Sequence, residues 1–387
     1  VARGQGFEPL RSLRRPSPRL VRSRPWFGAR TVACESSGVS FRTEVPARDL
    51  PRRLEYEHQV VLLGSCFAEN FGTKLHNLKF RCDVNPFGIL FNPHSISRAL
   101  RELGPKASGA PGGGLYTEAD LVQAGGGYWC SLQHHSAFNR ATPEETLSAI
   151  NTRLVAGRRA MQEADHIVVT LGTAWVYEHK ASGDVVASCH KLPHTSFTRR
   201  LLSVEEIVTN LVSAVLEACA WRSRDLSQDP TQVLLTLSPI RHWRDGAQES
   251  ALSKATLLVA LHQAMEQLRA AGVTAAYFPS YEIMMDDLRD YRFYAEDMLH
   301  PSNVAQEYIW SKLSKAWISS SALSVIDQVE RIQRAAKHRP LAIDSQTHQL
   351  FLQQQLRRID AIEASSTTVL DFNFERTQFM QQLSKNR

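Results

Sequence analysis

The segment QVVLLGSCFAEN, residues 59–70, decides the fold because it joins a buried strand directly to a helix. Four apolar residues, 60–63, end at Gly64, and a helical pattern begins shortly afterwards. A continuous run of Val and Leu is typical of a strand that a parallel sheet buries on both faces. Ligands of α/β proteins bind at the carboxyl ends of such strands. Ser65 and Cys66 therefore stand where a nucleophile is expected.

Similar apolar runs alternate with helical patterns along the chain. We expect further strands at 167–171 and within 232–242 and 273–282, and helices at 69–78, 95–103, 142–164, 204–221 and 253–271. This alternation predicts an α/β sandwich of three layers, with a mostly parallel sheet covered on both faces.

The pattern changes beyond about residue 318, where only helices are expected. There an apolar stripe suits packing on the main domain; it consists of Leu352, Leu356, Ile359 and Ile362. We therefore expect an α/β domain at 41–317 and a helical C-terminal extension at 318–387.

The positive charge is concentrated at the beginning of the chain. The formal net charge is +6, and residues 1–34 carry eight of the 45 Lys and Arg side chains but one of the 39 acidic ones. The remainder is close to neutral, so we expect no nucleic-acid binding. Residues 1–40, rich in Arg, Ser and Pro, read as an organellar transit segment for a plastid or mitochondrion. A basic tail or a misplaced start codon is the alternative, and the protein would then be cytoplasmic. No apolar run approaches the ~20 residues of a membrane span.

Six cysteines are scattered without a CxxC pair, which favours reduced thiols over disulfides or a structural zinc site. Cys189, His190 and His194 have the chemistry of metal ligands, but no further Cys or carboxylate stands at a fixed spacing from them. We expect neither a metal nor another cofactor.

A base for a nucleophile at residue 65 is expected near the end of the α/β region. Asp297 and His300 are three residues apart in a loop before a helix that begins at about Ser302. One turn can present the carboxylate to one imidazole nitrogen and leave the other free, as a catalytic triad requires. By spacing alone, a structural salt link or a helix start is the alternative. His242, which follows Arg241 after the strand within 232–242, is a rival base, and Arg241 could clamp an anionic substrate or form ion pairs.

Six motifs in order resemble the GSCFA domain family, which is grouped with the GDSL/SGNH hydrolase superfamily. They are GSCFA (64–68), NPFGILFNPHSI (85–96), TLGTAWVYE (170–178), HKLPHTSFTRRLLSVEEI (190–207), SPIRHWRDGAQESALSKATL (238–257) and YFPSYEIMMDDLRDYRFYAEDMLHPS (277–302). The similarity covers roughly residues 40 to 315, and KHRPL with the helix after it resembles the tail of many members. The resemblance implies a flavodoxin-like α/β/α fold and ester chemistry without a metal, with Ser65 as nucleophile and Asp297 and His300 as the DxxH pair.

The chain departs from the superfamily in its third block. An Asn of the oxyanion hole usually follows a glycine there, but this sequence has Gly172, Thr173 and then Ala174. Thr173, or Asn85 together with the Gly88 N–H, could substitute. The string CHK recurs in the family, so His190 and Lys191 are expected to line the cleft.

Cys66 is the competing nucleophile. A thiolate is more reactive than a serine hydroxyl, and a helix N-terminus lowers the pKa of a thiol. The residue after the strand-end position is nevertheless expected to turn back toward helix and sheet, so we expect Cys66 to be a small buried residue.

These observations predict a serine esterase or deacylase that acts on a carbohydrate or other small ester. An acyltransferase would use the same chemistry with an alcohol in place of water. The alternative is a non-catalytic binding module that kept the cleft and lost the third-block Asn. The oligomeric state is not readable from the sequence.

Overall fold

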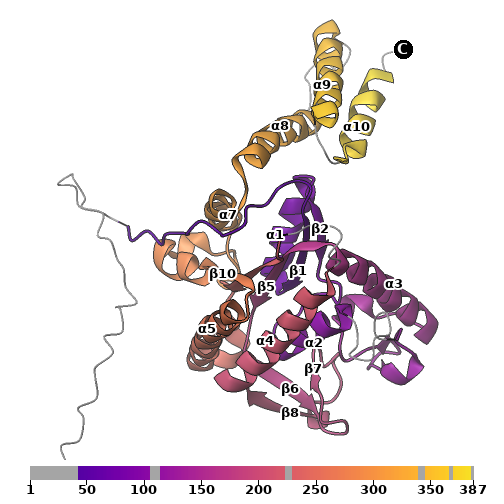
Figure 1. The fold of residues 1–387 in the computed structure, drawn as a ribbon. Coiled ribbons are helices and arrows are strands. Elements are labelled where there is room, and N and C mark those ends of the chain that lie inside the picture. The colour runs from indigo at the N-terminus through magenta and orange to yellow at the C-terminus, as the bar shows by residue number, and fades with distance from the viewer. Residues whose placement is uncertain (1–41, 105–113, 223–228, 339–344, 366–368, 385–387) are drawn as a thin grey trace, which may run out of the picture. The chain divides into compact units, whose positions relative to one another are not determined.

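The central sheet consists of five parallel strands, each followed or preceded by a covering helix (Figure 1). In the computed structural model, residues 42–104, 114–222, 229–338, 345–365 and 369–384 are described. The strand order is β10-β9-β5-β1-β2; the strands are β1 (Gln59–Gly64), β2 (Arg81–Val84), β5 (Ala164–Leu171), β9 (Gln232–Leu237) and β10 (Thr274–Phe278). Numbered among themselves, these strands follow the flavodoxin-like order 2-1-3-4-5, which confirms the predicted fold.

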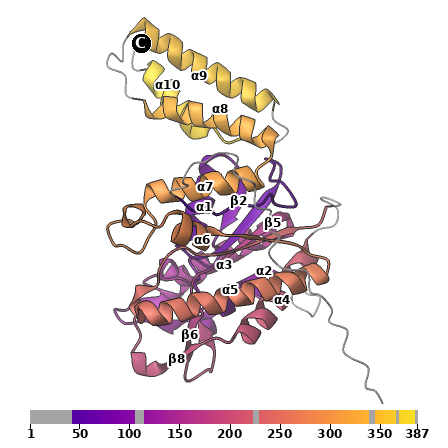
Figure 2. The ribbon, with the colours of Figure 1, turned by 90° about the vertical axis from the view of Figure 1, so that its left-hand side faces the viewer.

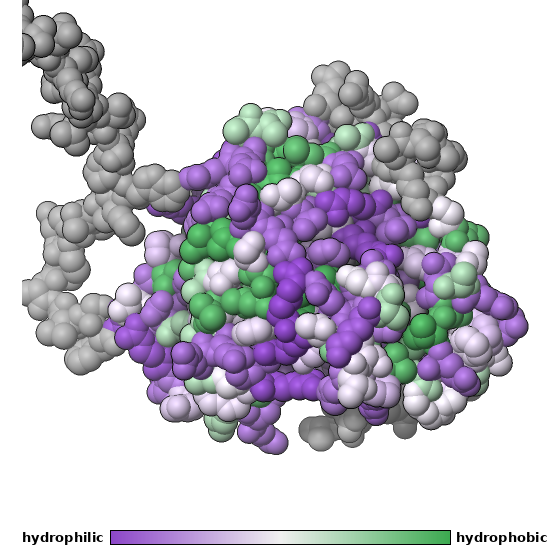
Figure 3. All heavy atoms as spheres, turned by 90° about the horizontal axis from the view of Figure 1, so that it is seen from below, coloured by the Kyte–Doolittle hydropathy of each residue, from purple (hydrophilic) through white to green (hydrophobic). Residues whose placement is uncertain are grey.

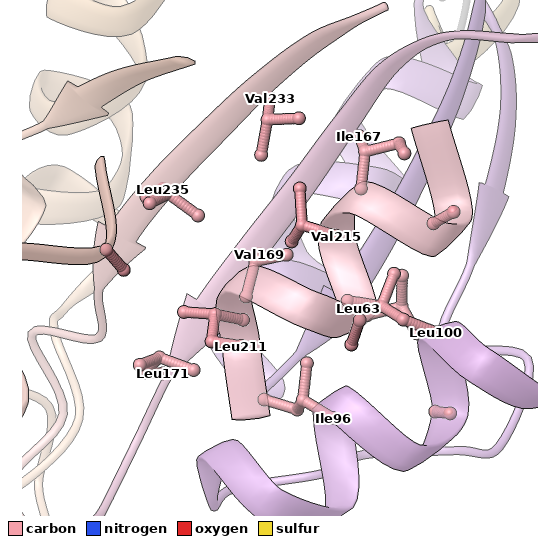
Figure 4. Close-up of a cluster of buried hydrophobic side chains, with 14 of the residues drawn as sticks. Leu63, Ile96, Leu100, Ile167, Val169, Leu171, Leu211, Val215, Val233 and Leu235 are labelled. Carbon is pink, nitrogen blue, oxygen red and sulfur yellow. The ribbon is translucent and has the colours of Figure 1, made fainter. Parts of the chain in front are cut away.

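Alternate residues of the buried strands point to opposite faces of the sheet, as a period of two requires. Val61 and Leu63 belong to one core cluster, whereas Val60 and Leu62 belong to the other. The first cluster is covered by α2 (Pro93–Leu103), α3 (Pro143–Gln162), α4 (Val204–Trp221) and α5 (Gly246–Ala270) (Figures 2 and 4). The second is covered by α1 (Cys66–Asn77) and α7 (Asn303–Trp317). The predicted three-layer sandwich is therefore confirmed.

Two small antiparallel sheets are inserted into this framework, and the sequence analysis did not foresee them. One pairs β3 (Val122–Gln123) with β4 (Trp129–Cys130). The other has the order β7-β6-β8 and comprises β6 (Trp175–His179), β7 (Val185–Val186) and β8 (Phe197–Leu201). Because β6 starts four residues after β5 ends, this second sheet begins at the carboxyl edge of the main sheet.

The C-terminal region is helical, as predicted, and consists of α8 (Ser320–Lys337), α9 (Gln346–Ser365) and α10 (Asn373–Ser384). The predicted stripe packs inward, with Leu352, Ile359 and Ile362 each at most 3% exposed. These residues share a core cluster with α1 and α7, and Thr43–Arg387 form one compact unit. The predicted basic segment 1–40 lies outside the described residues. None of the helices in the described ranges is long and apolar enough to cross a membrane.

Candidate functional site

The candidate site lies at the carboxyl end of β1, where the chain turns sharply into α1. Gly64 has a φ of +146°, and a Cβ there would lie 2.2 Å from the Thr170 carbonyl oxygen on β5, so only glycine fits. Ser65 then caps α1: its Oγ accepts a hydrogen bond from the Phe67 N–H at 3.3 Å. The Ser65 side chain is 1% exposed. Its hydroxyl is therefore buried and serves as the cap of α1.

Cys66 is the first residue of α1, and it makes the contact with His300 that was expected of Ser65. Its Sγ lies 3.7 Å from Nε2 of His300. The side chain is partly buried and packs against the core cluster of α1 and α7, as expected, and its sulfur also reaches the imidazole. The reason is geometric, because Cα–Cβ bonds in a helix tilt toward its N-terminus, and the first helical residue projects outward there. The structure thus places the thiol, and not the serine hydroxyl, against the imidazole.

Asp297 and His300 form the pair predicted from their spacing. Oδ2 of Asp297 accepts a hydrogen bond from Nδ1 of His300 at 2.6 Å, and Oδ1 accepts from the backbone N–H groups of Leu299 and His300, both at 2.9 Å. These bonds, the two from backbone N–H groups foremost, lower the pKa of Asp297 to about 2. Because Nδ1 carries the proton, Nε2 presents its lone pair to the Cys66 sulfur. Ser302 caps α7 directly after this loop, as expected.

The thiol is held in its neutral form until a base acts on it. Burial raises the pKa of Cys66 above its ordinary value, although the backbone N–H groups of Cys66 and Phe67 and the charge of Lys254 act in the opposite direction. At rest the side chain is therefore a thiol, and its sulfur faces Nε2 of His300.

Lys254 is a buried cation beside this site that the sequence analysis missed. It is 4% exposed, and its Nζ donates to the Ser238 carbonyl oxygen at 2.7 Å, after the end of β9. Burial lowers its pKa to about 7. The signal was present: Lys254 precedes Leu257 and Leu261 at helical spacing, so it stands in the apolar stripe of α5.

His242, the rival base, is not held by a carboxylate. Its Nε2 is buried and has no hydrogen-bond partner among the described residues; it packs against Gly172, where a Cβ would lie 3.1 Å away. Burial, with the neighbouring charges of Lys254 and His300, lowers the pKa of His242 to about 4. His242 is therefore neutral at ordinary pH.

Most of the predicted oxyanion donors are already used within the protein. The Gly88 N–H donates to the Asn85 carbonyl oxygen at 2.7 Å. The N–H groups of Gly172 and Thr173 both donate to the Phe91 carbonyl oxygen, at 2.8 and 3.0 Å. The Thr173 hydroxyl pairs with that of Ser253.

Asn85 differs from these candidates because its side-chain amide is only half used. Its Oδ1 accepts from the Gly64 N–H at 2.9 Å, which ties it to the turn before Cys66. Its Nδ2 is buried and has no partner within the described part of the chain. Of the predicted donors, this amide is the one with hydrogen-bonding capacity to spare.

The remaining predicted residues fall into different places. His190 is not among the residues that line the pocket beside Lys191. It is buried, its Nε2 donates to the carbonyl oxygens of Ser131 and His134, and its Nδ1 accepts from Asn139. Lys191 lines a pocket of about 570 Å³ that also contains Cys189 and His194.

Arg241 lies on the loop that follows β9. Its backbone N–H donates to the Leu299 carbonyl oxygen, which ties that loop to the Asp297–His300 turn, and its side chain lines a small cavity with Lys254 and Tyr281. Within the described ranges no three His, Cys, Asp or Glu side chains are grouped so that they could hold a metal ion.

Comparisons with known proteins place the chain in a family. A solved structure from Streptococcus pneumonia, described provisionally as a platelet activating factor, is similar to 67% of this chain and to 83% of its own, at 14% identity and a TM-score of 0.32. The comparison with curated proteins found no match. A family model described as the C-terminal domain of GSCFA domain proteins matches residues 329–385. The GSCFA family model matches residues 59–313, and the chain therefore belongs to the GSCFA family.

Proposed function

We propose that this protein is an acyl-transferring hydrolase that cleaves a carbohydrate or other small ester, with Cys66 as its nucleophile. The observation that carries the proposal is the contact of 3.7 Å between Cys66 Sγ and His300 Nε2, opposite the hydrogen bond from His300 Nδ1 to Asp297. Nucleophile, base and orienting carboxylate then stand in the order that acyl transfer needs. The family and the α/β/α fold fit a hydrolase. Compared with the sequence-based prediction, the reaction class is kept and the nucleophile changes from Ser65 to Cys66.

The first half of the reaction forms a thioester. The thiol proton passes to His300 Nε2 as Sγ forms a bond to the ester carbonyl carbon, and the carbonyl oxygen becomes an oxyanion. The tetrahedral intermediate collapses when the C–O bond to the alcohol breaks, and that oxygen takes the proton from Nε2. Asp297 stays ionised throughout and stabilises the imidazolium that forms between these steps.

The second half regenerates the thiol. Water gives a proton to Nε2 while its oxygen adds to the thioester carbonyl, and the C–S bond breaks as the sulfur recovers the proton. If an alcohol replaces water, the same steps transfer the acyl group to that alcohol. In both halves the oxyanion would be met by the Cys66 N–H at the start of α1 and by the Asn85 amide, because the next N–H groups of α1 already donate to Ser65.

The alternative is a binding module that does not catalyse a reaction. It is favoured by the bonds of Gly172 and Thr173 to Phe91, which leave no spare backbone donor at the third-block position. Missing oxyanion donors cost about 10²–10³ in rate each. A module of this kind would bind a ligand near Cys66 and leave esters intact.

The test is hydrolysis of p-nitrophenyl acetate by the full chain, with intact mass spectrometry of the protein after rapid acid quenching. We expect a burst of p-nitrophenol and an acetyl adduct that maps to Cys66 and is released by hydroxylamine. Cys66→Ala should abolish both signals. Cys219→Ala is the matched control, since burial in α4 raises the pKa of Cys219 to about 11 and keeps it unreactive. A folded protein without burst or adduct would favour the binding module.

A further inference from the structure

A pocket of about 570 Å³ lies beside the site and has no role in the mechanism above. It is formed where the β7-β6-β8 sheet meets the end of β5. Its walls are largely apolar and aromatic, and include Phe91, Trp175, Tyr177 and Leu192. The face that carries β6 and β8 mixes hydrophobic and hydrophilic residues when seen from below (Figure 3). A volume of this size suits a small organic ligand.

Phe91 and Thr173 both line the pocket, and the Thr173 N–H donates to the Phe91 carbonyl oxygen just after the end of β5. Gly64 on β1 is in register with Thr170 on β5. Cys66 and Thr173 each stand two residues after the end of their strand, and these two strands are neighbours. This junction of β1 and β5 is where the strand order reverses, the usual binding position in open α/β sheets. The Phe91 ring also stands edge-on to the His242 ring, with centroids 5.6 Å apart. Thr173 thus brings one wall of the pocket to the carboxyl edge of the sheet at which Cys66 also stands.

The charge of the pocket has one sign. Lys191 and Arg244 line it, and none of its described lining residues is an Asp or Glu. Neither Lys191 nor Arg244 forms an ion pair with a described residue. The nearby carboxylates of Asp245 and Glu249 are bound to Arg199, at 2.5 and 3.1 Å.

Both cations are presented by segments that are fixed in place. Arg244 lies in the short turn Trp243–Asp245, which is held through the ion pair of Asp245 with Arg199, and the Arg199 guanidinium stacks 3.7 Å from the centroid of Trp175 in the pocket wall. His190 and Lys191 have φ values of 45° and 60°. Such left-handed conformations are strained for residues other than glycine, and they persist where the surroundings hold them. Here the buried hydrogen bonds of His190 anchor the loop that carries Lys191.

We propose that this pocket binds the non-reacting end of an anionic ester, with Arg244 and Lys191 holding a carboxylate or phosphate and the apolar wall holding the carbon chain that leads to the ester. The placement of the ester at Cys66 rests on the proposed function, whereas binding of the anion does not. Charge-assisted hydrogen bonds to guanidinium and ammonium groups provide the selectivity, and the bidentate geometry of Arg suits both anions.

The test is isothermal titration calorimetry with full-chain protein carrying Cys66→Ala, so that no turnover is needed. The probes are monomethyl adipate, hexyl phosphate and, as the neutral match, dimethyl adipate. We expect at least one anionic probe to bind about tenfold or more tighter than dimethyl adipate, which corresponds to about 1.4 kcal/mol. Preference for the carboxylate or the phosphate probe identifies the anion.

Variants decide whether the cations of the pocket are responsible for binding the anionic probe. Arg244→Glu and Lys191→Glu should each weaken the affinity for the anionic probe about tenfold or more, and Arg244→Lys should keep most of that affinity. Arg331→Glu is the matched control, because Arg331 is exposed on α8 and does not line the pocket. Equal binding of neutral and anionic probes, no binding of any probe, or tight binding by a folded Arg244→Glu protein would overturn the proposal. Anion binding without ester hydrolysis in the unmodified chain would overturn only the proposed function.

Discussion

The exchange Asp297→Asn tests the catalytic assignment most directly, because it changes the charge and acceptor capacity of one group at almost constant size. The Asn oxygen can still accept the backbone N–H groups of Leu299 and His300, which bond to Oδ1 of Asp297 at 2.9 Å. The amide nitrogen would then face Nδ1 of His300 as a donor. The imidazole must respond by carrying its proton on Nε2, which faces the Cys66 sulfur. An imidazole in that tautomer cannot accept the thiol proton.

The magnitude follows from the bonds that are lost. Loss of a charge-assisted hydrogen bond from the transition state lowers a rate by about 10–150-fold. The wrong tautomer raises the loss to about 10⁴-fold in a triad. We therefore expect the acylation rate of Asp297→Asn to fall by about 10²–10⁴, measured as single-turnover release of p-nitrophenol. The stability of the protein should change little, since the Asp297 side chain is 47% exposed.

The control is Asp290→Asn in the same loop. Asp290 caps a short turn by accepting the Arg292 N–H at 3.0 Å, and its own hydrogen bonds do not include His300. Its acylation rate should stay within about threefold of that of the unmodified protein. A loss of less than about threefold in Asp297→Asn, with acylation still at Cys66, would refute the role of His300 as a base oriented by Asp297.

Three further predictions separate stability from chemistry. Ser65→Ala should cost about 1 kcal/mol of stability in urea unfolding through loss of the helix cap, yet keep most of the acylation that Cys66→Ala abolishes; the opposite ranking of the two variants would restore serine as nucleophile. Gly64→Ala should destabilise the protein by about 3 kcal/mol or more, because its Cβ would lie 2.2 Å from a backbone oxygen. Gly183→Ala, with a φ of +73° and nothing within 4 Å of the new Cβ, should cost about 1 kcal/mol. Similar urea-unfolding midpoints for the two variants would contradict the close approach of β1 and β5. The pKa of Lys254 is about 7 in the folded protein, against an ordinary value of 10.5. Between these two pH values the unfolded chain therefore binds more protons than the folded chain does. The buried Lys254 destabilises the fold fully below pH 7 and progressively less as the pH rises toward 10. Lys254→Met should therefore raise stability relative to the unmodified protein more at pH 6.5 than at pH 9.5, on the order of 3 kcal/mol, and a difference that is independent of pH would count against the buried cation.

The reading of the fold from the sequence succeeded where local patterns are strong. Runs such as 60–63 and 167–171 are continuous enough to indicate strands that are buried on both faces. The helices expected between such strands are the crossover connections that parallel strands require. The small sheet of β6, β7 and β8 was missed because its strands have only two to five residues, and β6 and β8 are half buried. Periodicity over so few residues carries little signal. The pocket that this sheet helps to form could not be foreseen either.

The candidate site likewise has a part that local sequence patterns predict and a part that only long-range packing determines. Asp297 and His300 were found from the sequence because a spacing of three residues in one turn is a local geometry, and the hydrogen bond of 2.6 Å depends on that turn. The choice between Ser65 and Cys66 is not local. Adjacent residues at a strand-to-helix turn point in different directions, and which one meets His300 depends on a loop more than 230 residues away in the chain. The burial of Lys254 is likewise set by how α5 packs on the sheet.

By itself, then, the sequence determined the parallel α/β/α architecture, the turn at Gly64 and the carboxylate–histidine pair, since each follows from backbone sterics, hydrophobic periodicity or neighbours within one turn. Only the tertiary structure decided that the Ser65 hydroxyl caps α1 while the Cys66 thiol faces His300, that Asn85 keeps an unused amide, and that Lys191 and Arg244 meet in one pocket. These facts depend on contacts between distant segments, and the packing of the whole domain sets their distances and directions.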